Sequence, residues 1–401
     1  MFRKALLYSC LLLFWGSCDR LFSPSSPNPE DYYLKFFGGG ATQDGIDVIE
    51  LNSDEIFILG HTTSFNNDGF SELYLIKVNA EGNELSNKVW GVNGTDNFAV
   101  DFEITKDENH LIIMSNYGDS ENQKIRVTKM NFEGNIIWEE DIGVQTNNIY
   151  IGADIEVLED GNGFIMTGSS RTISQDISFI FASEINDNGG LIWERIYGFV
   201  DRESEFGVKI TEYENNYLIL GRSVNNSTDE KPIIIEANKS NSGGEILSSI
   251  LYETEPGIIQ AKSFKAMEDS NFVLLVELVD NTEVGLIEVK VISRDRVLPN
   301  IPVAVEESFE LDATNFHPNN NGGFFITGNS NEDIFLIDVN RDGSTIWDSP
   351  RLFGGDGEDS SKDVIELSDK GILMIGTVDF SNGNSMIGII KTTKDGLLEE
   401  D

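Results

Sequence analysis

The pattern of apolar and polar residues recurs along the chain with a period of about 50 residues. Each unit holds short runs of β-branched and aromatic residues bounded by Gly, Asn or Asp, which is typical of strands joined by tight turns. The repeat is clearest where the second run of a unit ends, in FILGHT (57–62), IMTGSS (165–170), LILGRS (218–223), FITGNS (325–330) and MIGTVD (374–379). A period in this range predicts a repeat architecture.

Four strands are predicted in each unit, and in the first unit they cover 46–51, 55–62, 72–78 and 85–91. Four-stranded units at this spacing predict an all-β fold, a β-propeller. The first strands are expected at 46–51, 99–104, 153–158, 207–213, 261–267, 311–316 and 362–367. We therefore expect seven blades, with six or eight as the alternatives, because the fifth unit (251–303) departs from the pattern.

The two ends of the chain predict how the ring closes. The last unit supplies three strand patterns, at 362–367, 371–378 and 386–393, and then no clear fourth one. The segment 32–40 (YYLKFFGGG) precedes the first unit and has the pattern of a fourth strand. We expect it to complete the last blade, which would remove an exposed sheet edge. Residues 32–401 are then a single propeller domain.

The turn before the last strand of a unit carries the pattern N-x-x-G-x-x-x-W. It is seen in Asn131/Gly134/Trp138 and Asn340/Gly343/Trp347, and more loosely in Asn186/Gly190/Trp193. Glycine permits the positive φ of a tight hairpin, and Trp can pack between blades. The pattern resembles the repeat of quinoprotein-like (PQQ-like) propellers. Because the vicinal cysteine pair of the alcohol dehydrogenases with this repeat is absent, we predict no cofactor. The nearest resemblance is to lipid-anchored propellers that scaffold outer-membrane assembly.

The N-terminus has the pattern of an export signal. Residues 1–17 contain the basic Arg3 and Lys4, an apolar stretch at 5–15 that is too short to span a bilayer, and small residues before Cys18. This resembles a bacterial lipoprotein signal peptide, which implies that Cys18 is lipidated; the alternative is a secretory signal cleaved nearby. Residues 18–31 are predicted to be a flexible tether. The expected location is the outer membrane, on either its periplasmic or its outer face.

The charge balance restricts the partners. The chain has 69 acidic and 28 basic residues and a net charge of -41, so it should repel nucleic acid. Both of its cysteines, Cys10 and Cys18, precede the propeller. This excludes a disulfide framework or a thiolate metal site in the body. We expect a monomer that attaches to the membrane through its N-terminal lipid and contacts an envelope protein or glycan.

Carboxylates recur at nearly equivalent places in the predicted first strands, while Val208 and Lys262 replace them in the fourth and fifth units. These residues are Asp47, Asp101, Asp154, Asp312 and Asp363. In one interpretation they line the central channel and could hold a divalent cation such as calcium. In the other, each accepts backbone N–H groups and stabilises the blade.

The repeat fails most in three segments, 62–72, 223–232 and 293–302. Variation between units usually falls in loops that bind partners. A small basic group, Lys290, Arg294 and Arg296, could bind a carboxylate or phosphate, or could merely balance nearby acids.

Two functions follow as hypotheses. The first is a membrane-anchored extracytoplasmic binding or scaffold protein without catalytic activity, which presents its propeller loops to a protein or glycan. The alternative is a propeller hydrolase or lyase that acts on extracellular polysaccharide, with channel carboxylates as acid and base. The sequence contains no nucleophile elbow, zinc-protease helix or phosphate-binding loop of the common types.

Overall fold

The computed structural model describes residues 32–65, 68–119, 121–143, 147–173, 177–199, 204–226, 229–239, 243–252, 259–267, 272–278, 283–289, 301–303, 310–380 and 383–398. The strands within these ranges form seven four-stranded antiparallel sheets, here called blades 1 to 7. Blade 1 contains β2 (Gln43–Asn52), β3 (Glu55–Thr62), β4 (Glu72–Asn79) and β5 (Glu84–Trp90); blade 2 contains β6 (Asn97–Ile104), β7 (His110–Tyr117), β8 (Lys124–Asn131) and β9 (Ile136–Ile142); and blade 3 contains β10 (Asn148–Val157), β11 (Gly163–Thr172), β12 (Ser178–Asn186) and β13 (Leu191–Tyr197). Blade 4 contains β14 (Ser204–Tyr213), β15 (Asn216–Asn226), β16 (Asp229–Asn238) and β17 (Ile246–Leu251), and blade 5 contains β18 (Ile259–Ala266), β19 (Phe272–Leu278), β20 (Glu283–Val289) and β21 (Ile301–Pro302). Blade 6 contains β22 (Asp312–Pro318), β23 (Phe324–Ser330), β24 (Asp333–Val339) and β25 (Arg351–Phe353), and blade 7 contains β26 (Ser360–Glu366), β27 (Ile372–Phe380), β28 (Asn384–Thr392) and β1 (Tyr33–Phe37).

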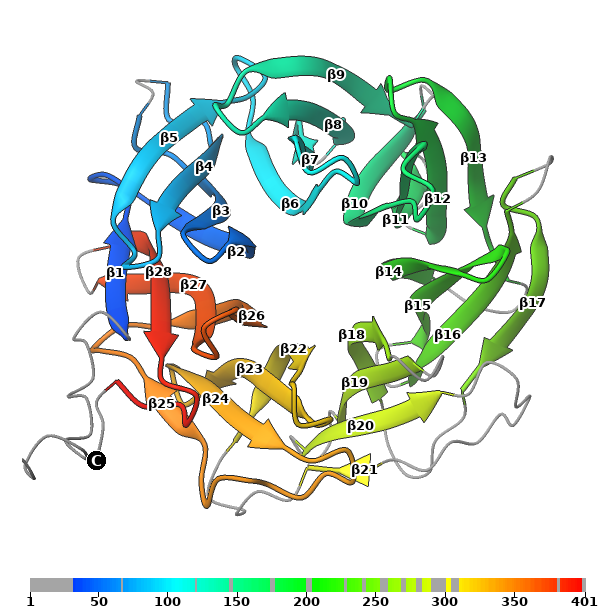
Figure 1. Ribbon diagram of the computed structural model, residues 1–401. Helices are drawn as coiled ribbons and strands as arrows, with labels where there is room; N and C mark the ends of the chain where they lie inside the picture. Colours follow the sequence, from blue (N-terminus) through cyan, green and yellow to red (C-terminus); the bar gives the residue numbers. More distant parts are fainter. Residues whose placement is uncertain are drawn as a thin grey trace, which may run out of the picture.

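The sheets stand side by side around a central opening (Figure 1). The first strand of each sheet lies nearest the centre and the last lies at the rim, as the labels β2 and β5 show for blade 1. The predicted β-propeller is therefore confirmed. Within the described residues there is no helix with the length and apolar character needed to cross a bilayer.

The ring is closed by the N-terminal strand, as the sequence predicts. Strand β1 pairs antiparallel with β28, with Tyr33 opposite Lys391 and Phe37 opposite Ile387. In Figure 1 the first strand (dark blue) lies beside the last one (red). Its register places Tyr33 where Trp138 and Trp193 stand in blades 2 and 3, because each of these residues faces the same position of the third strand.

The core lies between the blades. Buried apolar side chains form seven clusters, and each cluster joins two neighbouring sheets. The cluster between blades 7 and 1 contains Phe37, Val48, Ile58 and Ile387, so β1 also contributes to the core. Since burial of apolar surface is the main favourable term in folding, each blade depends on its neighbours for stability.

The recurring glycine of the second strand has a local cause. In every blade the register between the first and second strands shifts by one residue, a β-bulge. The bulge brings a carbonyl of the first strand close to the glycine: a Cβ added at Gly168 would lie 2.0 Å from the Ile151 oxygen. The same glycine occurs as Gly60, Gly221, Gly328 and Gly376.

We expect the substitution Gly168→Ala to destabilise the propeller by about 1–3 kcal/mol, because backbone must move to admit the methyl group. Urea unfolding followed by Trp fluorescence measures this loss. Gly40→Ala is the matched control, since a Cβ at Gly40 meets nothing within 4 Å. Equal unfolding midpoints for the two variants would contradict the close-approach explanation.

The Asn/Gly/Trp turn joins neighbouring blades. Asn131 Oδ1 accepts a hydrogen bond from the Asn135 N–H (2.8 Å), and Gly134 has φ of 81°. In the third unit the glycine with positive φ is Gly189 (82°) rather than Gly190, so this turn fits the motif fully. A Cβ at Gly189 would lie 3.2 Å from the Trp138 ring of the preceding blade. The Trp therefore packs against the next blade's turn.

Candidate functional site

One position of the inner strands forms a ring around the centre of the propeller. It is the residue that directly follows the β-bulge, and we call its members the ring positions. From blade 1 to blade 7 they are Asp47, Asp101, Asp154, Lys209, Ser263, Asn315 and Asp363.

The structure corrects the sequence alignment in units four to six. In units four and five the ring residues are Lys209 and Ser263, each one position after the expected Val208 and Lys262. In unit six the ring residue is Asn315, three positions after Asp312. Asp312 is exposed and forms an ion pair with Lys262 (3.0 Å). The ring position is set by the bulge, that is, by strand pairing. An alignment that relies on a recurring Asp therefore assigns the wrong residue in the blades where this Asp is replaced.

Three ring carboxylates, in blades 1 to 3, each join their blade to the next by a hydrogen bond from a backbone N–H group. The donors and acceptors are Phe102 N to Asp47 Oδ2 (3.4 Å), Ile155 N to Asp101 Oδ2 (2.9 Å) and Ile210 N to Asp154 Oδ2 (2.7 Å). Each donor follows the ring position of the next blade. Asn315 links blades 6 and 7 by a different bond, because its side-chain Nδ2 donates to Asp363 Oδ1 (2.7 Å). These side chains are thus structural links within the ring.

Four ring carboxyls are consecutive around the ring, and they affect one another. Burial and the charge of Asp363 raise the pKa of Asp47 to about 7. Burial raises the pKa of Asp101 to about 6 and that of Asp154 to about 7, although Lys209 opposes both shifts. The ring therefore carries protons near neutral pH.

Lys209 is the cation of the ring. Its Nζ lies 2.5 Å from Asp154 Oδ1 and 3.8 Å from Asp101 Oδ2. Burial acts to lower the pKa of Lys209, but the charges of Asp101 and Asp154 raise it well above its ordinary value. The lysine stays charged and neutralises part of the acidic arc.

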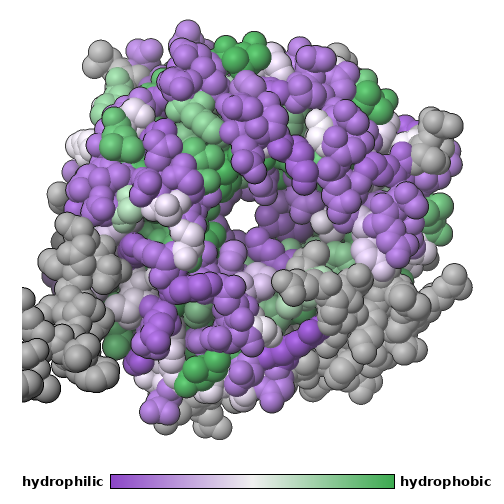
Figure 2. All heavy atoms as spheres, in the orientation of Figure 1, coloured by the Kyte–Doolittle hydropathy of each residue, from purple (hydrophilic) through white to green (hydrophobic). Residues whose placement is uncertain are grey.

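A second tier of titratable groups lies two residues further along the same inner strands. Burial and the charge of Asp154 raise the pKa of Glu156 to about 8, and burial raises that of Glu103. Burial and the charge of Lys265 lower the pKa of His317 to about 4. Figure 2 shows an opening at the centre of the propeller with mainly hydrophilic residues around it. The channel is thus polar and open rather than filled by apolar side chains.

The ring carboxylates are not arranged as a set of metal ligands. The described residues contain no group of three or more His, Cys, Asp or Glu side chains placed to hold a metal ion. Cys18, Lys290, Arg294 and Arg296 lie outside the described residues. The predicted lipidation site and basic binding group therefore stay predictions.

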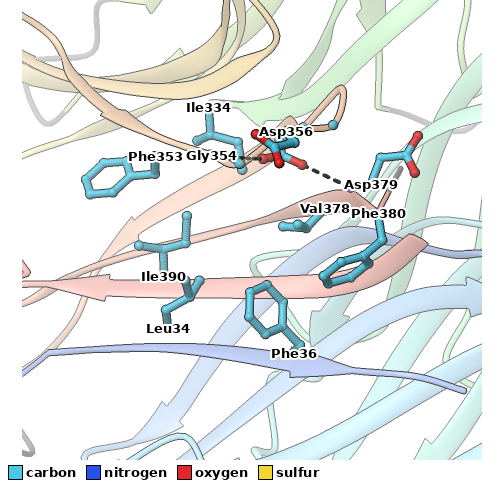
Figure 3. A pocket seen from close by; sticks show the side chains of 13 residues that line it. Leu34, Phe36, Ile334, Phe353, Gly354, Asp356, Val378, Asp379, Phe380 and Ile390 are labelled. Carbon is cyan, nitrogen blue, oxygen red and sulfur yellow. Dashed lines mark hydrogen bonds between the residues drawn. The ribbon is translucent and has the colours of Figure 1, made fainter. Parts of the chain in front are cut away.

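A separate pocket opens between blades 6 and 7, and nothing in the sequence analysis predicted it. Its volume is about 480 Å³. The residues that line it are Leu34 and Phe36 of β1, Ile334 of β24, Phe353 of β25, the loop residues Gly354, Gly355, Asp356, Gly357 and Asp359, Val378, Asp379 and Phe380 of β27, and Ile390 of β28 (Figure 3). An apolar cavity of this size with a few polar groups is the usual form of a binding site.

The apolar side of the pocket is accessible. Leu34, Phe36 and Phe380 are 45%, 40% and 37% exposed, and the two Phe rings meet edge to face with centroids 5.8 Å apart. Exposed apolar side chains gathered in one concave place mark a contact site more often than scattered ones do.

The acidic side of the pocket is a loop held in place by Asp359. This buried carboxylate accepts hydrogen bonds from Gly355 N (3.0 Å) and Asp379 N (2.9 Å). Burial, with the charges of Asp333 and Asp379, raises the pKa of Asp359. Asp356 is exposed and Asp379 half-buried, and both belong to the lining of the pocket, although the Asp379 side chain points away from the apolar side chains (Figure 3).

A sequence signal for the pocket exists. Six residues, DSPRLF, separate Trp347 from Gly354, whereas four residues stand between Trp and Gly in units two and three (EEDI and ERIY). The outer strand β25 is correspondingly only three residues long, next to the pocket. The two extra residues therefore mark the place, between blades 6 and 7, where the outer strand is shortened and the pocket opens.

The comparisons with known proteins show the fold alone. No protein-family model matches the chain, and no curated protein sequence matches it. Among solved structures, an oligogalacturonate lyase from Vibrio parahaemolyticus superimposes with a TM-score of 0.50 and 12% identity, covering 91% of this chain and 98% of the lyase. Extracellular domains 1–2 of Drosophila semaphorin 1b superimpose with a TM-score of 0.49 and 10% identity, over 91% of this chain and 85% of theirs. Likeness at this level of identity leaves the function to be argued from the sites.

Proposed function

We propose that this chain is an extracytoplasmic binding protein without catalytic activity, anchored to the outer membrane through lipidated Cys18. The observation that carries the proposal is the apolar pocket between blades 6 and 7. Phe36 and Phe380 stand exposed there, although apolar residues of this size are usually buried in a monomeric domain. A protein partner that covers this surface would remove it from water, which favours association.

The ring carboxylates support a binding function by what they already do. Asp101 and Asp154 accept backbone hydrogen bonds from the next blade, and Lys209 pairs with both. A group committed to holding two blades together is poorly placed to move during a reaction. The channel is therefore assigned to the scaffold, and the pocket to the partner.

The test is cross-linking in intact envelopes with a photoreactive amino acid placed at Leu34, which is 45% exposed on β1 and lines the pocket. We expect a discrete cross-linked species that is lost in Phe36→Asp and Phe380→Asp variants. Ile137→Asp is the matched control, because Ile137 is also an exposed apolar residue (53%) on an outer strand and lies in blade 2. Equal cross-linking in all variants would contradict a partner site at this pocket.

The anchor is tested separately. We expect metabolic labelling with a fatty acid to mark the chain, and Cys18→Ser to abolish the label and release the protein from membranes. A chain that is unlabelled and stays soluble would instead support cleavage of a plain secretory signal.

A second candidate is a hydrolase or lyase acting on extracellular polysaccharide, because the channel is open, polar and lined by carboxyls that titrate near neutral pH. Such groups suit general acid–base catalysis. Asp101→Asn and Asp154→Asn variants should then lose activity on a polysaccharide that the wild type cleaves. Full activity in both variants would exclude this candidate.

A further inference from the structure

We propose that the pocket between blades 6 and 7 binds a peptide segment in which an apolar side chain lies next to lysine or arginine. This inference rests on the proposed function and names the chemistry of its partner. It follows from the juxtaposition, in one cavity, of an exposed apolar surface and carboxylates that have no ion-pair partner among the described residues.

The size and the walls of the cavity suit side chains rather than a large ligand. About 480 Å³ lies at the small end of the range for ligand pockets. Its deeper apolar wall includes Ile334 (2% exposed) and Ile390 (3%), which belong to the core cluster between blades 6 and 7. Phe36 and Phe380 form its outer edge. One or two leucine or phenylalanine side chains would fit in such a space and leave room for the neighbouring residues of a peptide.

The carboxylates determine the charge of the partner. Asp356 and Asp379 border the pocket, and Asp333 lies against the loop, since its Oδ1 would be 2.0 Å from a Cβ at Gly354. In the described part of the chain, no lysine or arginine forms an ion pair with Asp356, Asp359 or Asp379. A cation brought by the partner would meet acids without a cation of their own, next to surface that excludes water.

The charge of the whole molecule acts in the same direction. With a net charge of -41, the protein attracts basic segments and repels acidic ones before contact. An acidic or purely apolar partner would leave these carboxylates facing like charge or desolvated without compensation, which costs free energy.

The test uses calorimetry on the purified full chain and three synthetic peptides that differ only in composition. The probe is acetyl-Gly-Lys-Leu-Phe-Lys-Gly-amide. In the second peptide both Lys are Glu, and in the third Leu and Phe are Ser. We expect the wild type to bind the probe at least tenfold more tightly than either of the other two.

A charge exchange makes the test specific. We expect the double variant Asp356→Lys/Asp379→Lys to weaken binding of the probe at least tenfold and to bind the Glu peptide instead. Asp54→Lys, at an exposed turn of blade 1, carries the same kind of charge change away from the pocket and should leave the preference intact. Phe380→Ala should lower the affinity for the probe without reversing the preference for Lys over Glu peptides.

The outcomes separate this inference from the proposed function. If the cross-link from Leu34 requires Phe36 and Phe380 but the Lys and Glu peptides bind equally, the partner chemistry is wrong and the binding site stands. If neither the cross-link nor any peptide depends on these residues, both are wrong. A tenfold gain in probe affinity after replacing residues 19–31 by a Gly/Ser linker would show that the chain's own Arg20-Leu21-Phe22 takes the pocket, which overturns the assignment to a partner.

Discussion

Lowering the pH from 8.5 to 6.5 is expected to stabilise the protein, by about 2 kcal/mol or more in the free energy of unfolding. The cause is the arc of carboxyls around the channel. Asp47 and Asp154 have pKa values of about 7 and Glu156 of about 8 in the folded chain, because burial raises all three. Ordinary surface carboxylates would not contribute in this range, since they remain ionised throughout it.

The sign follows from proton binding. A carboxyl whose folded pKa lies above its unfolded value, near 4, binds protons more tightly in the folded state. Its favourable contribution is complete below the unfolded pKa and is lost as the pH rises through the folded value, here about 7 to 8. Below pH 6.5 the effect is opposed by His317, whose pKa burial lowers to about 4, because the unfolded chain then gains a proton that the folded chain refuses.

Urea midpoints at constant ionic strength measure this effect. Glu156→Gln should raise stability at pH 8.5 by about 1–2 kcal/mol and remove roughly half of the pH dependence, since it deletes the carboxyl with the highest pKa of the three, while the Gln amide can keep the hydrogen bond to Thr211 of blade 4. Glu133→Gln, on an exposed turn, is the control. If the urea midpoint of the wild type were lower at pH 6.5 than at pH 8.5, the raised pKa values of these carboxyls would be contradicted.

Removal of residues 1–37 is expected to abolish folding into a soluble monomer. Without β1, the edge of β28 is unpaired along the positions opposite Tyr33 to Phe37. An exposed edge of this kind pairs with other chains and promotes aggregation. The cluster between blades 7 and 1 also loses Phe37, which is only 7% exposed.

Two milder experiments distinguish the loss of ring closure by β1 from a general effect of shortening the chain. Phe37→Ala should cost about 3–5 kcal/mol, as for a large aromatic residue removed from a core. A synthetic peptide covering 32–40, added in trans during refolding, should restore soluble protein to the truncated chain, whereas a scrambled peptide should not. A truncated chain with the wild-type melting temperature would show that closure by β1 contributes nothing to stability.

The fold could be predicted from the sequence because its determinants are local and repeated. The glycine at positions such as Gly168 and Gly376 marks the second strand in five of the seven blades, where a first-strand carbonyl lies too close for a Cβ. Ser115 and Val276 take this position in blades 2 and 5. The match between the strand 32–40 and the incomplete last unit predicted the closure that β1 and β28 form. A pattern repeated in several units corrects the errors made in any one of them.

The sites could be predicted only in part. Asp47, Asp101, Asp154 and Asp363 were found because one residue type recurs, but Lys209 and Asn315 fill the same place with other side chains. The bulge defines that place, and a bulge is a property of strand pairing rather than of residue type. The pocket was missed because its walls, β1 and β25, come from opposite ends of the chain.

The pairing of β1 with β28 also sets the order of assembly. The two strands are separated by about 350 residues, so their contact cannot form until nearly the whole chain has been synthesised. The strands of blades 1 to 6 are each contiguous in sequence and can pair earlier. During synthesis the N-terminal strand therefore stays without its partner longer than any strand of blades 1 to 6, and its pairing with β28 closes the ring.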